Sequence, residues 1–317
     1  MINDLSLQQD KPVLVLGSSS VDIVGLVENK LERGTSNPGK ITTSFGGTAR
    51  NFSENLARLG QEVTLLSTIG KDQMGRQLLK FTQKAGVNTE YMIQTKDYAT
   101  GSYLAVVNQE GELQFGLDDI HSSELLTPEY LEEHVHLFEE AALLFLDANL
   151  REDTLEKAMQ IAQDKGLLVA TDPTSISLSH KLKPYLPNIF LMTPNHIEAA
   201  NFCDFEVGEE VSDAEGLEIA KQMVSRGVEI AIVTLAEFGV CYATSESSGH
   251  IPAIRTQIVD PTAGGDALSA TVIFALLNGI PVDEAVRLGV SAASLTLKHR
   301  GAVYPNLNLE ILYDQLI

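Results

Sequence analysis

The sequence predicts an α/β protein, a doubly wound α/β/α sandwich of three layers with a small β-sheet lid. Three observations predict this class. Short aliphatic runs are apolar on both faces, as central parallel strands are. Longer segments with helical patterning alternate with these runs along nearly the whole chain. Two further segments break the alternation and have the patterning of half-exposed strands.

The alternating elements can be placed in order along the chain. The expected core strands lie at residues 13–16, 143–146, 167–170 and 230–233. The expected helices lie at residues 49–59, 73–85, 128–140, 154–164, 213–226, 263–278 and 282–298. Because no internal repeat or interdomain linker interrupts this series, we expect a single domain over residues 1–317.

The lid is expected from two insertions, at about residues 25–43 and 91–117. Apolar residues alternate at Tyr103, Ala105 and Val107, and turn residues occupy positions 36–39 and 109–112. This is typical of a hairpin with one exposed face. A small sheet inserted at two places would cover one edge of the core. A lid with an apolar face often pairs with another copy, so a homodimer through the lid is one expectation.

Charge excludes some classes of partner. The 317 residues include 22 Lys and Arg against 43 Asp and Glu, a formal net charge of −21. Nucleic acid polymers and anionic membranes are disfavoured, because binding them requires a basic face. Small anions such as ATP remain compatible, since local backbone NH groups and metal ions hold them.

The cysteines and the apolar segments indicate a reducing, aqueous compartment. Cys203 and Cys241 lie in apolar surroundings without metal-ligand spacing, so we expect two reduced core residues. The first residues lack the features of a signal peptide, and no segment approaches the roughly 18 apolar residues of a membrane span. We therefore expect a cytoplasmic protein.

The stretch from Asp260 to Ala267 contains the most informative motif. Ala263, Gly264 and Gly265 are small enough for backbone NH groups to approach an anion, and the helix that follows adds its partial positive charge. Asp266 is either a helix-start carboxylate or a general base beside this anion site. The second arrangement is the one that phosphoryl transfer to a hydroxyl requires.

Two other segments strengthen this interpretation. Asp22 follows the first strand closely, and Gly46, Gly47 and Asn51 open the first long helix. Ligands of open α/β sheets bind at the carboxyl ends of strands, so these residues could converge on a polyol. A turn or helix-cap role remains the alternative for Asp22.

Asn195 and Glu198 follow a short apolar strand and are three residues apart. On a helix they share a face, where their oxygens could hold hydrated Mg²⁺. A capping box, in which Asn195 caps the helix and Glu198 returns to its backbone, explains the spacing equally well.

Together these motifs resemble the ribokinase-like family of carbohydrate and nucleoside kinases, also called the phosphofructokinase B type. The resemblance rests on Gly-Gly-x-x-x-Asn, Asn-x-x-Glu and Asp-x-Thr-x-Gly-Gly-Asp in this order, and it covers residues 12–317 including both insertions. A shorter resemblance, at residues 36–41 and 46–51, is to the pseudouridine kinases within that family.

The resemblance implies a role for each matching residue. Asp266 would take the proton of a sugar hydroxyl while NH groups of Ala263, Gly264 and Gly265 stabilise the transferring phosphoryl group. The implied substrate site comprises Asp22, Ser20, Ser36, Lys40, Gly46, Gly47, Asn51 and Thr100. The implied nucleotide contacts are Asn195, Thr234, Gly239 and Gly264, and Asn195 with Glu198 would position Mg²⁺ mostly through water.

Three positions depart from the common family pattern. Ala263-Gly264-Gly265 stands where many members have Gly-Ala-Gly, which should be tolerated unless residue 263 needs a positive φ. Ser20 replaces a frequent Asn, which bears on the acceptor. Ala236 replaces a frequent Gly, which bears on the nucleotide contacts.

The function implied is an ATP-dependent kinase that phosphorylates the 5′-hydroxyl of a ribosyl compound, with pseudouridine as the favoured acceptor. Ribose, another nucleoside or a ketohexose is the alternative within the family. A catalytically silent sugar or nucleoside sensor is the alternative from another class. Mg²⁺ is the expected cofactor, and the resemblance also suggests a monovalent cation such as K⁺ near the Asp260 loop.

Overall fold

A large sheet forms the centre of the protein in a computed structural model that describes residues 8–109, 113–205, 207–208, 211–260 and 262–316. Within these residues its eight strands have the order β14-β13-β12-β11-β10-β9-β1-β4, and only the pairs β12–β13 and β13–β14 at one edge are antiparallel. The strands are β1 (Val13–Leu16), β4 (Val63–Leu66), β9 (Leu143–Asp147), β10 (Val169–Asp172), β11 (Leu191–Met192), β12 (Ile230–Thr234), β13 (Val240–Ala243) and β14 (Ser248–Ile251).

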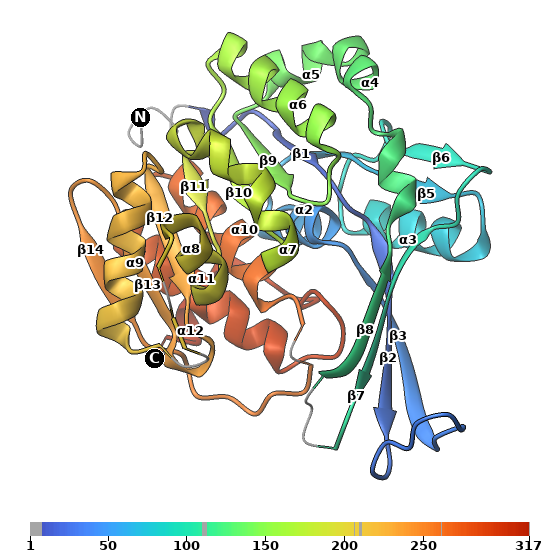
Figure 1. Ribbon diagram of the computed structural model, residues 1–317. Coiled ribbons are helices and arrows are strands. Elements are labelled where there is room, and N and C mark those ends of the chain that lie inside the picture. Colours follow the sequence, from blue (N-terminus) through green and yellow to red (C-terminus); the bar gives the residue numbers. More distant parts are fainter. Residues whose placement is uncertain (1–7, 110–112, 206, 209–210, 261, 317) are drawn as a thin grey trace.

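Helices cover both faces of this sheet, which confirms the predicted three-layer α/β/α class (Figure 1). One face carries α2 (Thr48–Leu59), α3 (Gln73–Lys84), α10 (Gly264–Leu277), α11 (Val282–Leu297) and α12 (Leu309–Asp314). The other carries α4 (Pro128–Glu133), α5 (Val135–Glu140), α6 (Glu152–Lys165), α7 (Ile176–Ser179), α8 (His196–Cys203) and α9 (Asp213–Ser225). Short 3₁₀ turns lie at His121–Leu125, His180–Asn188 and Ala236–Phe238.

Strand β1 is buried on both faces, which explains why its sequence does not alternate between apolar and polar residues. Val13 and Val15 face one core, whereas Leu14 and Leu16 face the other, and each is at most 1% exposed. The helix α10 is similarly enclosed, since it packs against both α2 and α11 and is buried from Ala267 to Leu277. This rigid core fixes the start of α10, where the motif that ends in Asp266 lies.

A second sheet, called the lid below, projects from the body beside the large sheet (Figure 1). Its strands are β2 (Ser20–Val27), β3 (Gly39–Gly46), β7 (Gly101–Val107) and β8 (Leu113–Asp119), in the order β3-β2-β7-β8. Of the second insertion, β6 (Ile93–Thr95) pairs instead with β5 (Thr68–Gly70). The turn expected at 109–112 lies mostly outside the described residues, as does Pro261 of the loop before α10.

The lid has two chemically different faces. Asp22 is in register with Ser44 and Tyr103, so these side chains share one face. The opposite face exposes Ile41, Phe115 and Leu117, at 74%, 54% and 57%. One face is therefore polar at its base, and the other presents large apolar side chains to the surroundings.

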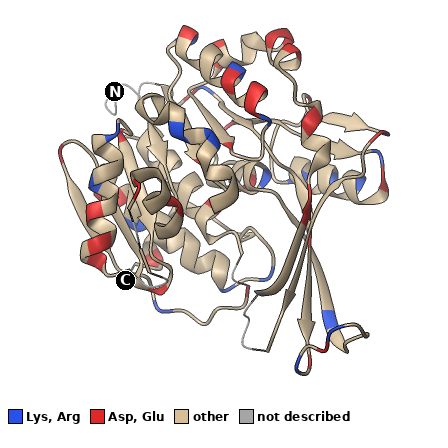
Figure 2. Ribbon diagram, viewed as in Figure 1, with Lys and Arg blue, Asp and Glu red and all other residues tan. Residues whose placement is uncertain are grey.

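Acidic side chains are distributed over the outer helices, including α6 and α9 (Figure 2). In the described part of the chain no helix is long and apolar enough to cross a membrane. Cys203 and Cys241 are both buried and free, as expected, and burial raises the pKa of each thiol to about 11.

One helix expected from the sequence is interrupted in the structure. The segment 128–140 forms two short helices, α4 and α5, that meet at His134, whose φ of −114° and ψ of 23° are not helical. The His134 ring packs against Tyr130 at 4.3 Å between centroids, and its Nδ1 lies 2.8 Å from the Tyr130 carbonyl oxygen. A side chain that competes for a helical carbonyl favours such a break.

Candidate active site

The candidate active site lies where the carboxyl ends of neighbouring strands meet the base of the lid. The chain leaves β1 at Gly17 and enters the lid at Ser20, while β9 and β10 end at Asp147 and Asp172. Asn195 and Thr234, after β11 and in β12, form a parallel bridge. Ligands of doubly wound sheets bind at this edge.

Asp266 lies in the first turn of α10, with its carboxyl group pointing toward α2. Its Oδ2 accepts a hydrogen bond of 2.8 Å from Asn51 Nδ2. Although part of the residue remains accessible to solvent, burial of the carboxyl group raises its pKa to about 7, while the Asn51 hydrogen bond opposes this rise. A carboxyl group with a pKa near neutrality can accept a proton at physiological pH.

The residues before Asp266 form the start of α10. Ala263 is its N-cap and has φ 59° and ψ 12°, so the alanine stands where the backbone requires a positive φ. The left-handed conformation costs a residue with a Cβ roughly 1 to 2 kcal/mol. The free NH groups of a helix start bind anions, and Gly265 is exposed there.

A cavity of about 310 Å³ opens directly beside this helix start. Thr234, Gly239, Ala263, Gly264 and Gly265 line one part of it. The remaining wall is mostly apolar: Val240, Ala253, Ile254, Leu268, Val290, Ala293 and Leu297. The structure thus brings the predicted nucleotide contacts Thr234, Gly239 and Gly264 to one cavity. An apolar cleft that ends in anion-binding NH groups fits a planar base with an attached phosphate chain.

The lid contributes Asp22, which sits above two glycines. A Cβ at Gly46 would fall on the Asp22 carboxyl group, and a Cβ at Gly47 would lie 2.6 Å from the Ser18 carbonyl oxygen. Ser20 Oγ donates to Asp22 Oδ1 at 3.3 Å, and burial raises the pKa of Asp22 to about 6. The glycines therefore permit the close approach of the lid base to α2.

Asn195 and Glu198 form the capping box at the start of α8. Asn195 Oδ1 accepts hydrogen bonds from the backbone NH groups of Ile197 and Glu198, at 3.0 and 2.9 Å, and Glu198 Oε2 accepts one of 2.9 Å from Asn195 N. Burial raises the pKa of Glu198. Among the described residues no three His, Cys, Asp or Glu side chains converge as a metal-ligand set. Mg²⁺ held by phosphates and water needs no such set.

Comparison with known proteins agrees with this geometry. Residues 10–309 match the family described as pfkB family carbohydrate kinase. The chain belongs to this family. The pseudouridine kinase of Escherichia coli (strain K12) is 30% identical over 298 residues, which cover 94% of this chain and 94% of that protein. The ribokinase of Haemophilus influenzae (strain ATCC 51907 / DSM 11121 / KW20 / Rd) is 29% identical over 295 residues, or 92% and 94%.

The fold of this pfkB-family kinase also matches solved structures. The structure of Arabidopsis thaliana ribokinase complexed with ribose and ATP aligns with a TM-score of 0.81 at 19% identity, over 96% of this chain and 98% of that chain. The ribokinase-like fold, with its mostly parallel sheet and small lid, is therefore confirmed.

Of three other predicted substrate residues of the kinase, two lie along the lid away from this cluster and one is engaged in other contacts. Lys40 pairs with Leu26, four residues along β2 from Asp22, which corresponds to roughly 13 Å at about 3.3 Å per residue. Ser36 is exposed in the loop beyond it. The Thr100 hydroxyl donates to Asp72 Oδ1 at 2.9 Å and accepts from Gly70 N, so it anchors the start of α3.

Sequence analysis missed Asp147, which the structure places at the centre of the site. It is fully buried, and its Oδ2 accepts hydrogen bonds from Ser18 N, Ser18 Oγ and Ala49 N at 2.8, 2.7 and 3.1 Å. Its Oδ1 accepts one from Asn149 N at 3.0 Å. Asp147 thus ties the turn after β1 to the start of α2. The available signal was an acid directly after an apolar strand.

Asp172 was missed in the same way, although it also ends an apolar strand. Its Oδ1 accepts a hydrogen bond of 2.7 Å from Thr174 N. Burial, together with the charges of Asp266 and Glu198, raises the pKa of Asp172 well above its usual value. The site therefore concentrates carboxyl groups from several strand ends.

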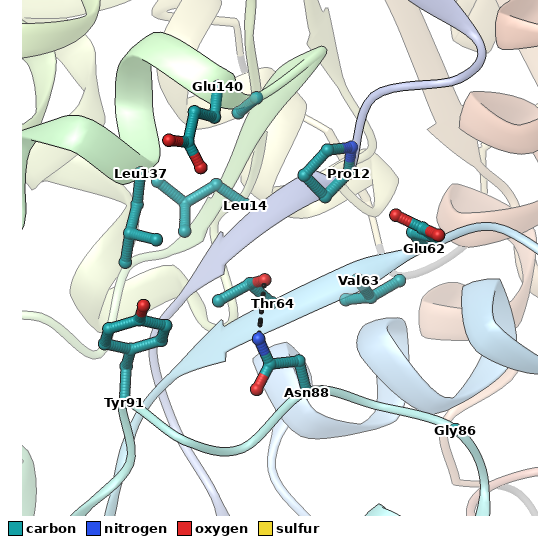
Figure 3. Close-up of a pocket in the computed structure, with 11 residues that line it drawn as sticks. Pro12, Leu14, Glu62, Val63, Thr64, Gly86, Asn88, Tyr91, Leu137 and Glu140 are labelled. Atoms are coloured by element: carbon teal, nitrogen blue, oxygen red, sulfur yellow. Dashed lines mark hydrogen bonds between the residues drawn. The ribbon is translucent and has the colours of Figure 1, made fainter.

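Another cavity, of about 410 Å³, lies at the opposite edge of the sheet (Figure 3). Pro12 and Val63 line it near the amino ends of β1 and β4, and Asn88 Nδ2 donates to Thr64 Oγ1 across it at 3.4 Å. None of the predicted site residues lines this cavity. We do not assign it to the active site, since strands of this class present their carboxyl ends to ligands.

Replacing Glu198 with glutamine tests its proposed role toward Mg²⁺. We expect the Mg²⁺ concentration for half-maximal rate to rise roughly 10-fold or more, as when other groups around a metal are changed, with a small change in Tm because glutamine can keep the capping box. Glu215, which forms the same box with Ser212 at the start of α9, supplies the matched control Glu215→Gln. A large loss of Tm with unchanged Mg²⁺ dependence would show that Glu198 only caps the helix.

Proposed function

We propose that this pfkB-family kinase transfers the terminal phosphoryl group of ATP to the 5′-hydroxyl of a ribosyl compound, with pseudouridine as the favoured acceptor. The observation that supports it most directly is Asp266, a carboxyl group with a pKa near 7 in the first turn of α10, directly after the residues 263–265 that line a mostly apolar cavity. A proton acceptor beside a phosphoryl site is what transfer to an alcohol requires.

The proposed chemistry balances with the groups present. The acceptor oxygen forms a bond to the γ-phosphorus, the bond from that phosphorus to the β–γ bridging oxygen breaks, and ADP leaves. The hydroxyl proton passes to Asp266, while NH groups at 263–265 stabilise the charge on the phosphoryl oxygens. Mg²⁺ bound with ATP would supply further charge neutralisation, and Glu198 with Asn195 would hold it through water. The requirement for K⁺ stays a prediction.

On the acceptor side, Asp22 and Asn51 would hold ribose hydroxyls. Asn51 donates a hydrogen bond to Asp266, and Asp22 is near enough for its charge to raise the pKa of Asp266. Gly47, with φ 93°, would present its backbone to the same sugar. Ser36 and Lys40 lie farther out, so any contact they make is with a part of the acceptor remote from the reacting hydroxyl, such as a base.

The relatives support a ribosyl acceptor but differ on which one. The identities to a pseudouridine kinase and to a ribokinase, 30% and 29%, are nearly equal. The resemblance at residues 36–41 and 46–51 favours pseudouridine. Ribose remains the second candidate, because the residues beside Asp266 would recognise the sugar in either compound.

The decisive experiment is an acceptor panel with purified protein, ATP and Mg²⁺, in which ADP and the phosphorylated product are both measured. We expect kcat/KM to be highest for pseudouridine among pseudouridine, uridine, adenosine, ribose and fructose. A higher value for ribose would reassign the enzyme as a ribokinase. ATP turnover that no acceptor increases would support the silent sensor instead.

We also propose that two copies pair through the exposed apolar face of the lid. Ile41, Phe115 and Leu117 share this face and would be buried in such a pair. We expect light scattering to give about twice the 34.4 kDa of one chain, and Phe115→Asp to halve that mass. A parent protein that is monomeric at micromolar concentration would contradict the proposal.

A further inference from the structure

Arg50 is one of the largest fully buried side chains of the protein, with 1% of its surface exposed. It directly precedes Asn51 in α2. Its Nη1 donates to the Phe45 carbonyl oxygen and to Asn51 Oδ1, both at 2.8 Å, and its Nε donates to Thr82 Oγ1 at 3.4 Å. It also forms a buried ion pair with Glu54.

The contact to Asn51 determines how that amide group is oriented. A guanidinium group has only donors, so the Asn51 atom that faces Arg50 must be the carbonyl oxygen. The NH₂ group of Asn51 therefore faces the other way, where Nδ2 lies 2.8 Å from Asp266 Oδ2. The three side chains form one directed chain of hydrogen bonds, from guanidinium through amide to carboxylate.

We infer that Arg50 is a positioning residue, which locks the Asn51 amide so that its NH₂ group always donates to Asp266. An amide free to rotate could turn its oxygen toward Asp266 and stabilise the protonated carboxyl group, which cannot accept a proton. The locked amide instead favours the ionised form. This inference rests on the proposed role of Asp266 as the base.

The charges around Asp266 make such a device necessary. From the lid and from β9, the charges of Asp22 and Asp147 raise the pKa of Asp266, and Asp172 at the end of β10 interacts with it. Arg50 is the cation that opposes them, and the Asn51 hydrogen bond acts in the same direction. Burial lowers the pKa of Arg50 only to about 10, so it stays charged at pH 7.

Helix α2 offers a matched control for Arg50. Glu54 lies four residues after Arg50 and four residues before Arg58, and both arginines pair with it. Arg58 does not contact Asn51; it donates to Glu54 Oε1 and to the Pro305 carbonyl oxygen. Arg50→Lys and Arg58→Lys therefore make the same chemical change to the same ion-pair network. Only Arg50→Lys removes the guanidinium group that donates to Asn51.

The test measures the ionisation of Asp266 in the free protein. The ¹³Cγ signal of Asp266 is assigned by its absence in Asp266→Asn and is followed as a function of pH. The midpoint of its titration should shift to higher pH in Arg50→Lys and should not change in Arg58→Lys. The acidic limb of kcat against pH should move the same way. Misplacement of reacting groups can cost about 100-fold, so we expect a loss of kcat/KM of roughly 10- to 100-fold at pH 7 for Arg50→Lys alone.

A second comparison separates positioning from stability. In an Asn51→Ala background, Arg50→Lys should have almost no further effect on the Asp266 titration, because the amide group through which Arg50 acts on Asp266 is absent. If Arg50→Lys does not fold, the paired change Arg50→Met with Glu54→Met removes both members of the buried ion pair. Arg58, which also pairs with Glu54, then keeps the Pro305 carbonyl oxygen as its acceptor. The paired change should also raise the Asp266 titration midpoint, since the guanidinium group that holds the Asn51 amide is lost.

Equal Asp266 titrations in the parent and both Arg50 variants would overturn the inference, as would an additive effect in the Asn51→Ala background. Failure of the proposed function is recognised separately. Full activity of Asp266→Asn would reject Asp266 as the base, whereas the ¹³C titration reports on the hydrogen-bond chain without any turnover.

Discussion

Replacing Asp266 with asparagine is expected to lower kcat by about 10²- to 10⁴-fold, the usual cost of removing a positioned general base. Asparagine has nearly the same shape and can still accept the Asn51 hydrogen bond, so ATP affinity and folding should change little. The measurement is steady-state kinetics on the best acceptor of the panel, with ATP binding followed separately. Turnover near that of the parent would contradict the assignment.

The raised pKa of Asp266 should give activity and stability opposite dependences on pH in the parent protein. The parent's kcat should fall as pH falls through about 7, where Asp266 gains its proton. Its ordinary pKa is 3.8, so between about 4 and 7 the folded protein binds more protons than the unfolded chain. Stability therefore decreases as pH rises through this window.

Asp266→Asn removes this linkage. We expect the variant to unfold at a higher Tm than the parent at pH 8, and the difference to shrink as pH approaches 4. Thermal unfolding at several pH values measures it. A parent protein whose Tm rises from pH 5 to pH 8 by as much as that of the variant would show that Asp266 is not held partly protonated by the fold.

Replacing Asp147 with alanine is expected to cause the largest loss of stability at the site. The carboxylate accepts from Ser18 N, Ser18 Oγ, Ala49 N and Asn149 N, and alanine would leave these buried donors unpaired. At about 1 to 3 kcal/mol for each unsatisfied group, the free energy of unfolding should fall by at least about 3 kcal/mol. Denaturant unfolding measures this loss.

Asp147→Asn separates the charge of Asp147 from its hydrogen bonds. Asparagine keeps one acceptor oxygen, so it should be less destabilising than alanine. Because the charge of Asp147 raises the pKa of Asp266, its removal should move the acidic limb of kcat to lower pH, opposite to the shift expected for Arg50→Lys. For the alanine variant described above, a free energy of unfolding equal to that of the parent would show that the turn after β1 does not depend on the Asp147 carboxylate.

Local patterning predicted most of the fold because each element buries a characteristic set of side chains. The run 13–16 was predicted to the residue, since strands buried on both faces need no alternation. The helix expected at 263–278 begins one residue later, at Gly264. The break at His134 could not be predicted, because it depends on the packing of its ring against Tyr130, a contact that periodicity does not contain.

The site was predictable where a backbone requirement restricts the residue type. Gly46 and Gly47 are such positions, because a Cβ at either would meet Asp22 or Ser18. The sequence does not predict the role of Asp147, which depends on Ser18, 129 positions away. Nor does it predict the positioning role of Arg50, which depends on how the Asn51 amide group is oriented. In the lid loop, Asn37 Oδ1 accepts a hydrogen bond from Glu32 N, and Asn37 Nδ2 donates to the Thr35 carbonyl oxygen.

The gathering of Asp22, Asp147, Asp172, Glu198 and Asp266 at one edge of the sheet bears on how the reaction ends. A ribosyl acceptor enters uncharged, whereas its phosphate ester carries close to two negative charges at pH 7. In the proposed reaction the ionised members of this group would repel the ester once it has formed, and poor screening inside the site would strengthen that repulsion. We therefore expect the arrangement to promote product release and to discriminate against acceptors that already carry a phosphate.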